Sequence, residues 1–363
     1  MDFGLSEEQE MLRNAARDFL TDKCPKKLVR EMEQDEKGYS PQLWQQMADL
    51  GWMGLAFPEK YGGSDMSFLD LAVLLEETGR ACLPGPFFST VLLGGLPILD
   101  AGTEAQKAEY LPQIASGKAI VTLALTEAAA GYDAASIQLT ATPDNNEYIL
   151  NGTKLFVPDA YVADYLLCAA RTSDKGKPED GITVFIIDTG CPGISITPLK
   201  TIARDKLGEV VLNNVRVPGA NILGSLNEGW SIIQKALERA AVAKCCEMVG
   251  GMQAVLEMTV EHAKQRVQFG AAIGTFQAIQ HHCANILTAV DSSRVITHEA
   301  AWKLSKNLPC HLCSHIVHTG KNLHVYLLRA LFAKYVERFE LSAQPLQRKI
   351  SRFDRHDNVR GGP

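Results

Sequence analysis

The sequence lacks the features that would place the protein in a membrane, in a secretory pathway or on nucleic acid. No apolar run reaches the roughly 20 residues that a membrane-spanning helix needs. The first eight residues are acidic and hold neither the basic segment nor the apolar core of a secretory leader. Acidic residues outnumber basic ones, and the net charge of −6 disfavours a nucleic-acid-binding surface. We therefore expect a cytoplasmic protein that neither spans a membrane nor binds nucleic acid.

Signatures of several common sites are also missing. The sequence holds neither a Gly-x-Gly-x-x-Gly fingerprint nor a P-loop, so a dinucleotide would have to be bound in some other way. Nine cysteines in a chain of 363 residues without a leader are expected to be reduced thiols rather than a disulfide framework. Cysteines and histidines crowd residues 310–318 without the long spacer of a zinc finger, so we predict no metal site.

Helical and β patterns divide the chain into three stretches. Residues 1–118 show helical apolar spacing, with a capping box at Ser6 and a helix that starts after Ser40-Pro41. Residues 119–226 hold short β-prone runs between Pro, Gly and Asp turns, and a module of this size fits a small barrel or sandwich. Residues 227–363 return to a helical pattern. The order helical, β, helical predicts an α+β fold and argues against a Rossmann sheet.

Individual elements are predicted within these stretches. Asn151-Gly152 separates two β-prone runs, and because Asn-Gly is the strongest short hairpin signal we expect a turn there. Helices are expected at residues 68–82, 103–116, 231–268 and 275–306, and further strands at residues 182–187, 194–196 and 209–212.

A carboxylate and an arginine-containing motif lie on the predicted C-terminal helices. Glu238, in Leu-Glu-Arg, carries a carboxylate, which has the chemistry of a general base. Lys235 lies three residues earlier and offers the alternative that Glu238 forms an ordinary surface ion pair. Arg266, Phe269 and Gly270 form an Arg-x-x-Phe-Gly motif, and two N–H groups of a guanidinium can meet two oxygens of a diphosphate at once.

Further motifs lie in turns and at strand ends. Thr126-Glu127 closes an apolar run and precedes a turn that contains Tyr132, while Phe156 and Pro158 follow the Asn-Gly dipeptide. Tyr61 precedes two glycines in a turn between helices. Each motif also has a plain structural explanation, as a strand end, a core aromatic or a turn.

In this order the motifs resemble those of the acyl-CoA dehydrogenase family over roughly residues 2–309. The resemblance implies an N-terminal all-α domain (1–118), a middle β-barrel or β-sandwich domain (119–226) and a C-terminal helical bundle (227–363). It implies FAD-dependent α,β-dehydrogenation of an acyl-CoA thioester to the 2-enoyl-CoA, with electrons passed to an electron-transferring flavoprotein.

The resemblance also implies residue roles. Glu238 matches the catalytic base of the isovaleryl- and long-chain branch of the family, and the alternative Tyr-Glu-Gly base motif is absent from this chain. Arg266 and Gln277 match residues that contact the FAD of a neighbouring subunit, which implies a homodimer or a homo- or heterotetramer. The full set of implied cofactor-binding residues is Leu125, Thr126, Phe156, Pro158, Arg266, Phe269 and Gln277, and the implied substrate-binding residues are Tyr132, Arg239 and Tyr61.

Departures from the family pattern leave two alternatives open. Ala128 and Pro158 replace the usual Pro and Thr, and Tyr132 stands where many members carry Ser. After Pro309 the resemblance stops, and the family's Gln-x-x-Gly-Gly-x-Gly turn is missing from the sequence. The chain could therefore be a non-catalytic partner subunit of a hetero-oligomeric dehydrogenase, or it could be an acyl-CoA oxidase.

Overall fold

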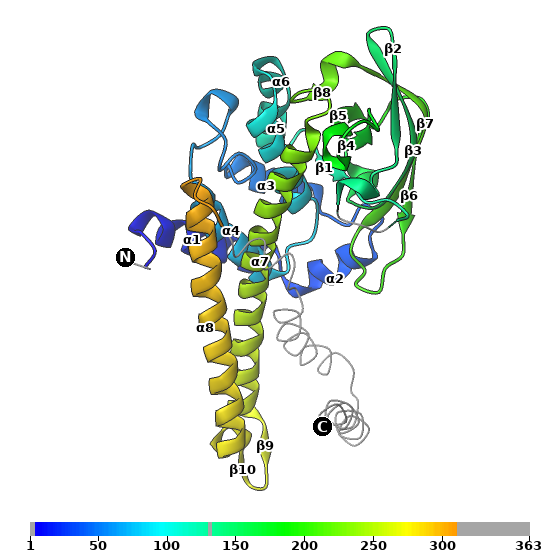
Figure 1. Ribbon diagram of the computed structural model, residues 1–363. Helices are drawn as coiled ribbons and strands as arrows, with labels where there is room; N and C mark the ends of the chain where they lie inside the picture. Colours follow the sequence, from blue (N-terminus) through cyan, green and yellow to red (C-terminus); the bar gives the residue numbers. More distant parts are fainter. Residues whose placement is uncertain (1–3, 130–132, 311–363) are drawn as a thin grey trace, which may run out of the picture. The chain divides into compact units, whose positions relative to one another are not determined.

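The computed structural model of the protein describes residues 4–129 and 133–310. These residues form two structural units, one made of residues 4–251 and 291–310 and the other of residues 252–290. Most of the first unit consists of a group of helices followed along the chain by an eight-stranded sheet (Figure 1). The helical, β, helical order predicted from the sequence is confirmed.

The N-terminal helices begin where the capping residues predict. Ser6 and Gln9 form a reciprocal capping box, with the Gln9 amide N–H donating to Ser6 Oγ at 3.2 Å. Ser40 caps the next predicted start, ahead of a proline that suits the first helical turn. The helices are α1 (Glu7–Lys23), α2 (Lys26–Gln34), α3 (Pro41–Asp49), α4 (Phe68–Ala81), α5 (Leu96–Ala101) and α6 (Glu104–Ala115), joined by the short helices η1 (Glu59–Tyr61) and η2 (Ser89–Gly95).

The middle of the chain folds into one sheet with the strand order β6-β7-β3-β2-β4-β5-β8, and β1 pairs with β4 in parallel. In the described part of the chain, β6 and β8 are the two edge strands of this sheet and do not pair with each other. The sheet therefore does not close into a barrel. The strands are β1 (Val121–Ala124), β2 (Thr140–Asp144), β3 (Glu147–Pro158), β4 (Tyr165–Arg171), β5 (Ile182–Asp188), β6 (Ile194–Leu199), β7 (Leu207–Pro218) and β8 (Ile222–Leu223).

The prediction of a hairpin turn at Asn151-Gly152 is wrong. Strand β3 runs through this dipeptide, and the chain reverses instead between β2 and β3, where Asn145 has a φ of +56°. At Gly152 the pairing register of β3 with β7 shifts, and a Cβ at this position would lie 2.8 Å from Leu139 Cγ. Asn-Gly therefore marks an irregularity inside a strand, where a close approach of another segment requires glycine.

The two long C-terminal helices are confirmed with small shifts at their ends: α7 spans Gly229–Gln265 and α8 spans Gln277–Ser305. In the second unit a hairpin of β9 (Val267–Gln268) and β10 (Ala271–Ala272) joins them. Among the described residues, no helix is both long enough and apolar enough to cross a membrane.

In the first unit, helices α4 and α7 approach so closely that their backbones touch. A Cβ added to Gly79 on α4 would lie 1.9 Å from the Glu247 carbonyl oxygen on α7. A Cβ added to Gly250 on α7 would lie 1.7 Å from the Glu76 carbonyl oxygen on α4. Both glycines are required here by space rather than by backbone dihedral angles, because any side chain would push the helices apart.

We expect Gly250→Ala to lower the thermal unfolding midpoint, because overpacking typically costs about 1–3 kcal/mol and the clash here is with backbone. Gly251→Ala is the matched control, because a Cβ at Gly251 would lie 3.6 Å from the Gly79 carbonyl oxygen, an ordinary contact. Since alanine favours helix over glycine by up to about 1 kcal/mol, the control variant should be as stable as the wild type or more stable. Equal unfolding midpoints for the two variants would contradict the close contact.

Candidate active site

The ends of β1 and β3 lie side by side and bring two of the predicted cofactor-binding segments together. The Leu155 N–H donates to the Thr126 carbonyl oxygen at 2.8 Å. Lys154 Nζ donates to the Leu125 carbonyl oxygen at 3.0 Å and to Glu127 Oε1 at 2.6 Å. One lysine therefore fixes both residues that flank Thr126.

Lys154 and Glu127 form a buried ion pair, with side chains 0% and 8% exposed. The Glu127 carboxylate also accepts the Gln138 N–H at 2.9 Å and the Leu139 N–H at 3.1 Å. These N–H groups bond the remaining lone pairs of the carboxylate. They offset part of the desolvation cost of burying the ion pair. The sequence did not reveal Lys154, because nothing in an Asn-Gly-Thr-Lys run shows that the lysine faces the core.

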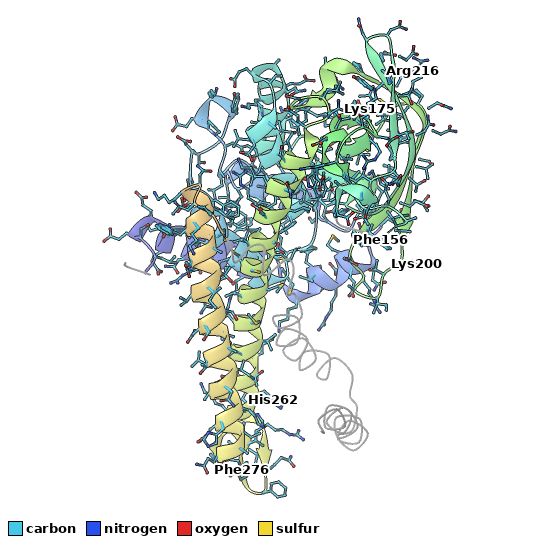
Figure 2. The ribbon with its side chains drawn as sticks, viewed as in Figure 1. Phe156, Lys175, Lys200, Arg216, His262 and Phe276 are labelled. Atoms are coloured by element: carbon cyan, nitrogen blue, oxygen red, sulfur yellow. The ribbon has the colours of Figure 1, made fainter. Side chains whose placement is uncertain are left out.

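Phe156 and Pro158 occupy the last residues of β3. Phe156 has a φ of +55° and lies where the register with β7 shifts, and its side chain is 52% exposed (Figure 2). A large aromatic held outward at a strand end can cover a planar ligand. Pro158 has no N–H and no polar side chain, so it cannot donate a hydrogen bond to a ligand.

Glu238 lies on α7 with an exposed side chain, and its carboxylate makes no hydrogen bond or ion pair with another described residue. Its two basic neighbours form ion pairs with a different residue. Lys235 Nζ lies 3.0 Å from Asp100 Oδ1, and Arg239 donates to Asp100 Oδ2. The alternative that Lys235 pairs with Glu238 is therefore not observed, and Asp100, which the sequence did not single out, is the partner of both cations.

Tyr61 lies at the end of η1 and is 5% exposed. Its hydroxyl donates to Glu104 Oε2 at 2.8 Å, and Lys60 Nζ lies 3.0 Å from the same oxygen. Hydrogen bonds from Lys60 and from Tyr61 lower the pKa of Glu104 to about 2. Because the hydroxyl proton is already donated to Glu104, Tyr61 could offer a substrate only its ring or an acceptor oxygen. Tyr132, the third predicted substrate-binding residue, lies outside the described residues.

The Arg-x-x-Phe-Gly motif forms the hairpin of the second unit. Phe269 (φ +53°) and Gly270 (φ +77°) are the two loop residues between β9 and β10, as a tight hairpin turn requires. Phe269 is 96% exposed, and its ring packs edge-on against that of Phe276, with centroids 6.3 Å apart; Phe276 is labelled in Figure 2. Arg266 is exposed, and Gln277, also exposed, begins α8. The motif thus exposes an aromatic ring and a guanidinium to solvent, and the start of α8 exposes an amide.

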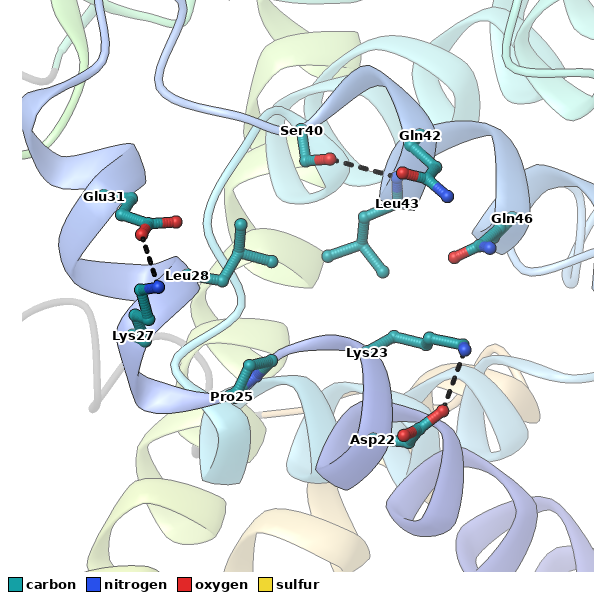
Figure 3. Close-up of a pocket in the computed structure, with 10 residues that line it drawn as sticks. All are labelled: Asp22, Lys23, Pro25, Lys27, Leu28, Glu31, Ser40, Gln42, Leu43 and Gln46. Atoms are coloured by element: carbon teal, nitrogen blue, oxygen red, sulfur yellow. Dashed lines mark hydrogen bonds and ion pairs between the residues drawn. The ribbon is translucent and has the colours of Figure 1, made fainter.

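A separate open pocket of about 350 Å³ lies among α1, α2 and α3 (Figure 3). Its lining includes Lys23, Leu28 and Gln46, and none of the predicted site residues contributes to it.

Three domain models of one family match the chain in order: "Acyl-CoA dehydrogenase, N-terminal domain" at residues 6–118, the middle domain at residues 122–215 and the C-terminal domain at residues 227–324. The probable acyl-CoA dehydrogenase YngJ of Bacillus subtilis is 36% identical over 323 residues, which cover 85% of this chain and 82% of that protein. The chain belongs to the acyl-CoA dehydrogenase family.

Acyl-CoA dehydrogenases are FAD-dependent oxidoreductases that act on CH–CH groups. The structure of butyryl-CoA dehydrogenase from Megasphaera elsdenii is similar, with a TM-score of 0.81, 31% identity and coverage of 93% of this chain and 92% of that one. The caffeyl-CoA reductase-Etf complex subunit CarC of Acetobacterium woodii is 32% identical over 82% of this chain and 79% of that one. The predicted family, fold class and cofactor class are confirmed, whereas the domain bounds and the residue roles stay predictions.

The residues at the ends of β1 and β3 fit the flavin of an acyl-CoA dehydrogenase. The Thr126 hydroxyl makes no hydrogen bond with another described residue and is only partly buried, so it can bond a ligand. The exposed Phe156 ring supplies a flat apolar surface. Pro158 supplies no hydrogen bond, so the chain holds one fewer donor than the family pattern.

Replacing Lys154 with methionine should destabilise the fold by about 3–5 kcal/mol, because Glu127 would remain as a buried charge without its partner. The double variant Lys154→Met/Glu127→Gln removes that charge and should recover a large part of the loss, measured as the free energy of unfolding in urea. Purely additive effects of the two substitutions would show that the pair is not coupled.

Proposed function

We propose that this protein dehydrogenates an acyl-CoA thioester at its α,β-bond to give the 2-enoyl-CoA, with Glu238 as the base. The observation that carries the proposal is the unpaired Glu238 carboxylate on α7, whose neighbours Lys235 and Arg239 are both held by Asp100. A carboxylate without an ion pair can accept a proton. The two cations next to it are held by Asp100 and do not compete for it.

The chain's own groups have defined tasks in this reaction. Glu238 accepts the α-proton, and the C–H electron pair forms the new double bond as hydride leaves the β-carbon. Bound FAD supplies the two-electron oxidant that accepts this hydride. Thr126 and Phe156 orient the flavin through a hydroxyl and an aromatic face, and Lys154 holds the Thr126 segment in place through Leu125 and Glu127.

Glu238→Gln should slow the anaerobic bleaching of bound FAD by acyl-CoA by at least about 100-fold, since general base catalysis contributes about that much or more. The cofactor should stay bound, because Glu238 lies on none of the cofactor-binding segments. Glu257→Gln, an exposed carboxylate on the same helix, is the matched control and should bleach at the wild-type rate. Wild-type bleaching by Glu238→Gln would remove Glu238 from the role of base.

We also propose that Arg266, Phe269 and Gln277 bind the FAD of a second copy of the chain, so that the working enzyme is a dimer or a tetramer. Support comes from their exposure: Phe269 is 96% exposed and the hairpin that carries it presents a guanidinium to solvent. An electron-transferring flavoprotein is the proposed acceptor, in line with the Etf complex named for CarC.

Arg266→Gln should weaken FAD binding about 10- to 100-fold, because a hydrogen bond to a charged group contributes about 1.5–3 kcal/mol. Lys264→Gln is the matched control, since it removes an exposed positive charge two residues away in the same unit. FAD retention during dialysis of the purified full-length protein measures the effect. If both variants lose FAD to the same extent, only the general charge of the surface matters.

A non-catalytic partner subunit is the second candidate function, and the missing hydrogen bond at Pro158 favours it. Purified protein that binds FAD but is never bleached by any acyl-CoA would support this candidate. Peroxide formation with oxygen would instead indicate an acyl-CoA oxidase.

A further inference from the structure

Asp100 lies where the end of α5 meets the first turns of α7. One of its carboxylate oxygens, Oδ1, lies 3.0 Å from Lys235 Nζ, and the other, Oδ2, accepts a hydrogen bond from Arg239. Each oxygen is thus committed to one cation. Arg239 is the more enclosed cation, with a side chain 15% exposed against 49% for Lys235. A single carboxylate on α5 therefore holds the two cations that precede and follow Glu238 along α7.

Neither α5 itself nor the packing of α5 and α7 explains a carboxylate at this position. Asp100 lies in the last turn of α5, where the helix dipole disfavours a negative charge. The two helices are already joined by apolar contacts, because a Cβ added to Gly224 would lie 2.7 Å from Ile232 Cδ1 on α7 and 3.8 Å from Ala101 Cβ on α5. The carboxylate of Asp100 therefore acts on the charges of α7 rather than on the positions of the helices.

Lys235 is the cation on α7 that could pair with Glu238 if Asp100 did not hold it. Side chains three and four positions apart are neighbours on the surface of a helix. For Lys235 these positions are Ser231, Ile232, Glu238 and Arg239. Glu238 carries the one carboxylate in this set. Without Asp100, the attraction between opposite charges would therefore turn Lys235 towards Glu238.

The charge balance around Glu238 depends on Asp100 as well. Asp100, Lys235, Glu238 and Arg239 carry no net charge together, because two carboxylates balance two cations. A neutral residue in place of Asp100 would leave an excess positive charge, which would grow when Glu238 takes up a proton. Nearby positive charge favours the ionised form of a carboxylate and so opposes proton uptake. Asp100 therefore makes Glu238 a better proton acceptor.

We propose that Asp100 is a positioning residue for the proton transfer, because it holds Lys235 away from Glu238 and so keeps the base free. This inference rests on the proposed dehydrogenase function with Glu238 as the base. Asp100 acts through Lys235 and not through a contact of its own with the substrate or the cofactor. Loss of Asp100 should therefore slow the chemical step and leave the binding of the acyl-CoA unchanged.

The test measures anaerobic bleaching of bound FAD over a series of concentrations of one thioester, the one that bleaches the wild type fastest among straight, branched and cyclic acyl-CoAs. Asp100→Asn should lower the limiting rate about three- to fivefold, the upper range of an exposed ion pair, without changing the half-saturating concentration. Asp100→Asn/Lys235→Gln should recover most of that rate, because the competing cation is gone. Asp144→Asn is the matched control and should bleach at the wild-type rate, since Asp144 pairs with Arg216 on the sheet.

An unchanged limiting rate in Asp100→Asn, a loss that Lys235→Gln does not restore, or an equal loss in Asp144→Asn would overturn the inference. A merely structural role of Asp100 would give the second of these results. If no thioester bleaches the wild type, the proposed dehydrogenase function fails instead, and crystal structures of the full-length wild type and Asp100→Asn decide the inference. Lys235 Nζ within about 4 Å of the Glu238 carboxylate in the variant alone supports it, and any other position of Lys235 overturns it.

Discussion

The buried ion pair of Lys154 and Glu127 is the interaction on which the candidate site depends. It joins the end of β1 to the end of β3, and it is satisfied by two backbone N–H groups as well as by the charges themselves. Because the pair is shielded from solvent, its geometry is maintained far better than that of a surface ion pair. Thr126 and Phe156 lie close to the pair along the chain, so the pair also fixes their backbone positions. A site that must align a planar cofactor is better built on such a fixed frame than on mobile loops.

Much of the fold followed from local patterns. The caps at Ser6 and Ser40 and the apolar period of the long helices are properties of contiguous residues, so the sequence alone predicted α7 and α8 to within three residues at each end. The prediction of a turn at Asn151-Gly152 was wrong for the opposite reason. Whether Asn-Gly becomes a turn or a bulge depends on β7, which lies some sixty residues further along the chain, and local pattern contains no information about that pairing.

The site was predictable only in outline. Motif order named the segments around Thr126, Phe156 and Glu238, because the chemistry of a flavin and a C–H acid requires residues of those types. Their partners were not predictable: Asp100 and Lys154 are ordinary residues in sequence and matter only through contacts with distant segments. Electrostatic roles of this kind arise from tertiary structure, so a motif can identify the acting residue but not the residue that holds it.

The contact between Gly79 and Gly250 limits how this site can diversify. Since the backbones of α4 and α7 touch there, α7 cannot shift towards or away from α4 without losing that contact. This crossing fixes the position of α7 against α4, so the segment of α7 that carries Glu238 keeps its position relative to α4. New substrate preferences must therefore arise by exchanging side chains on a stationary helix.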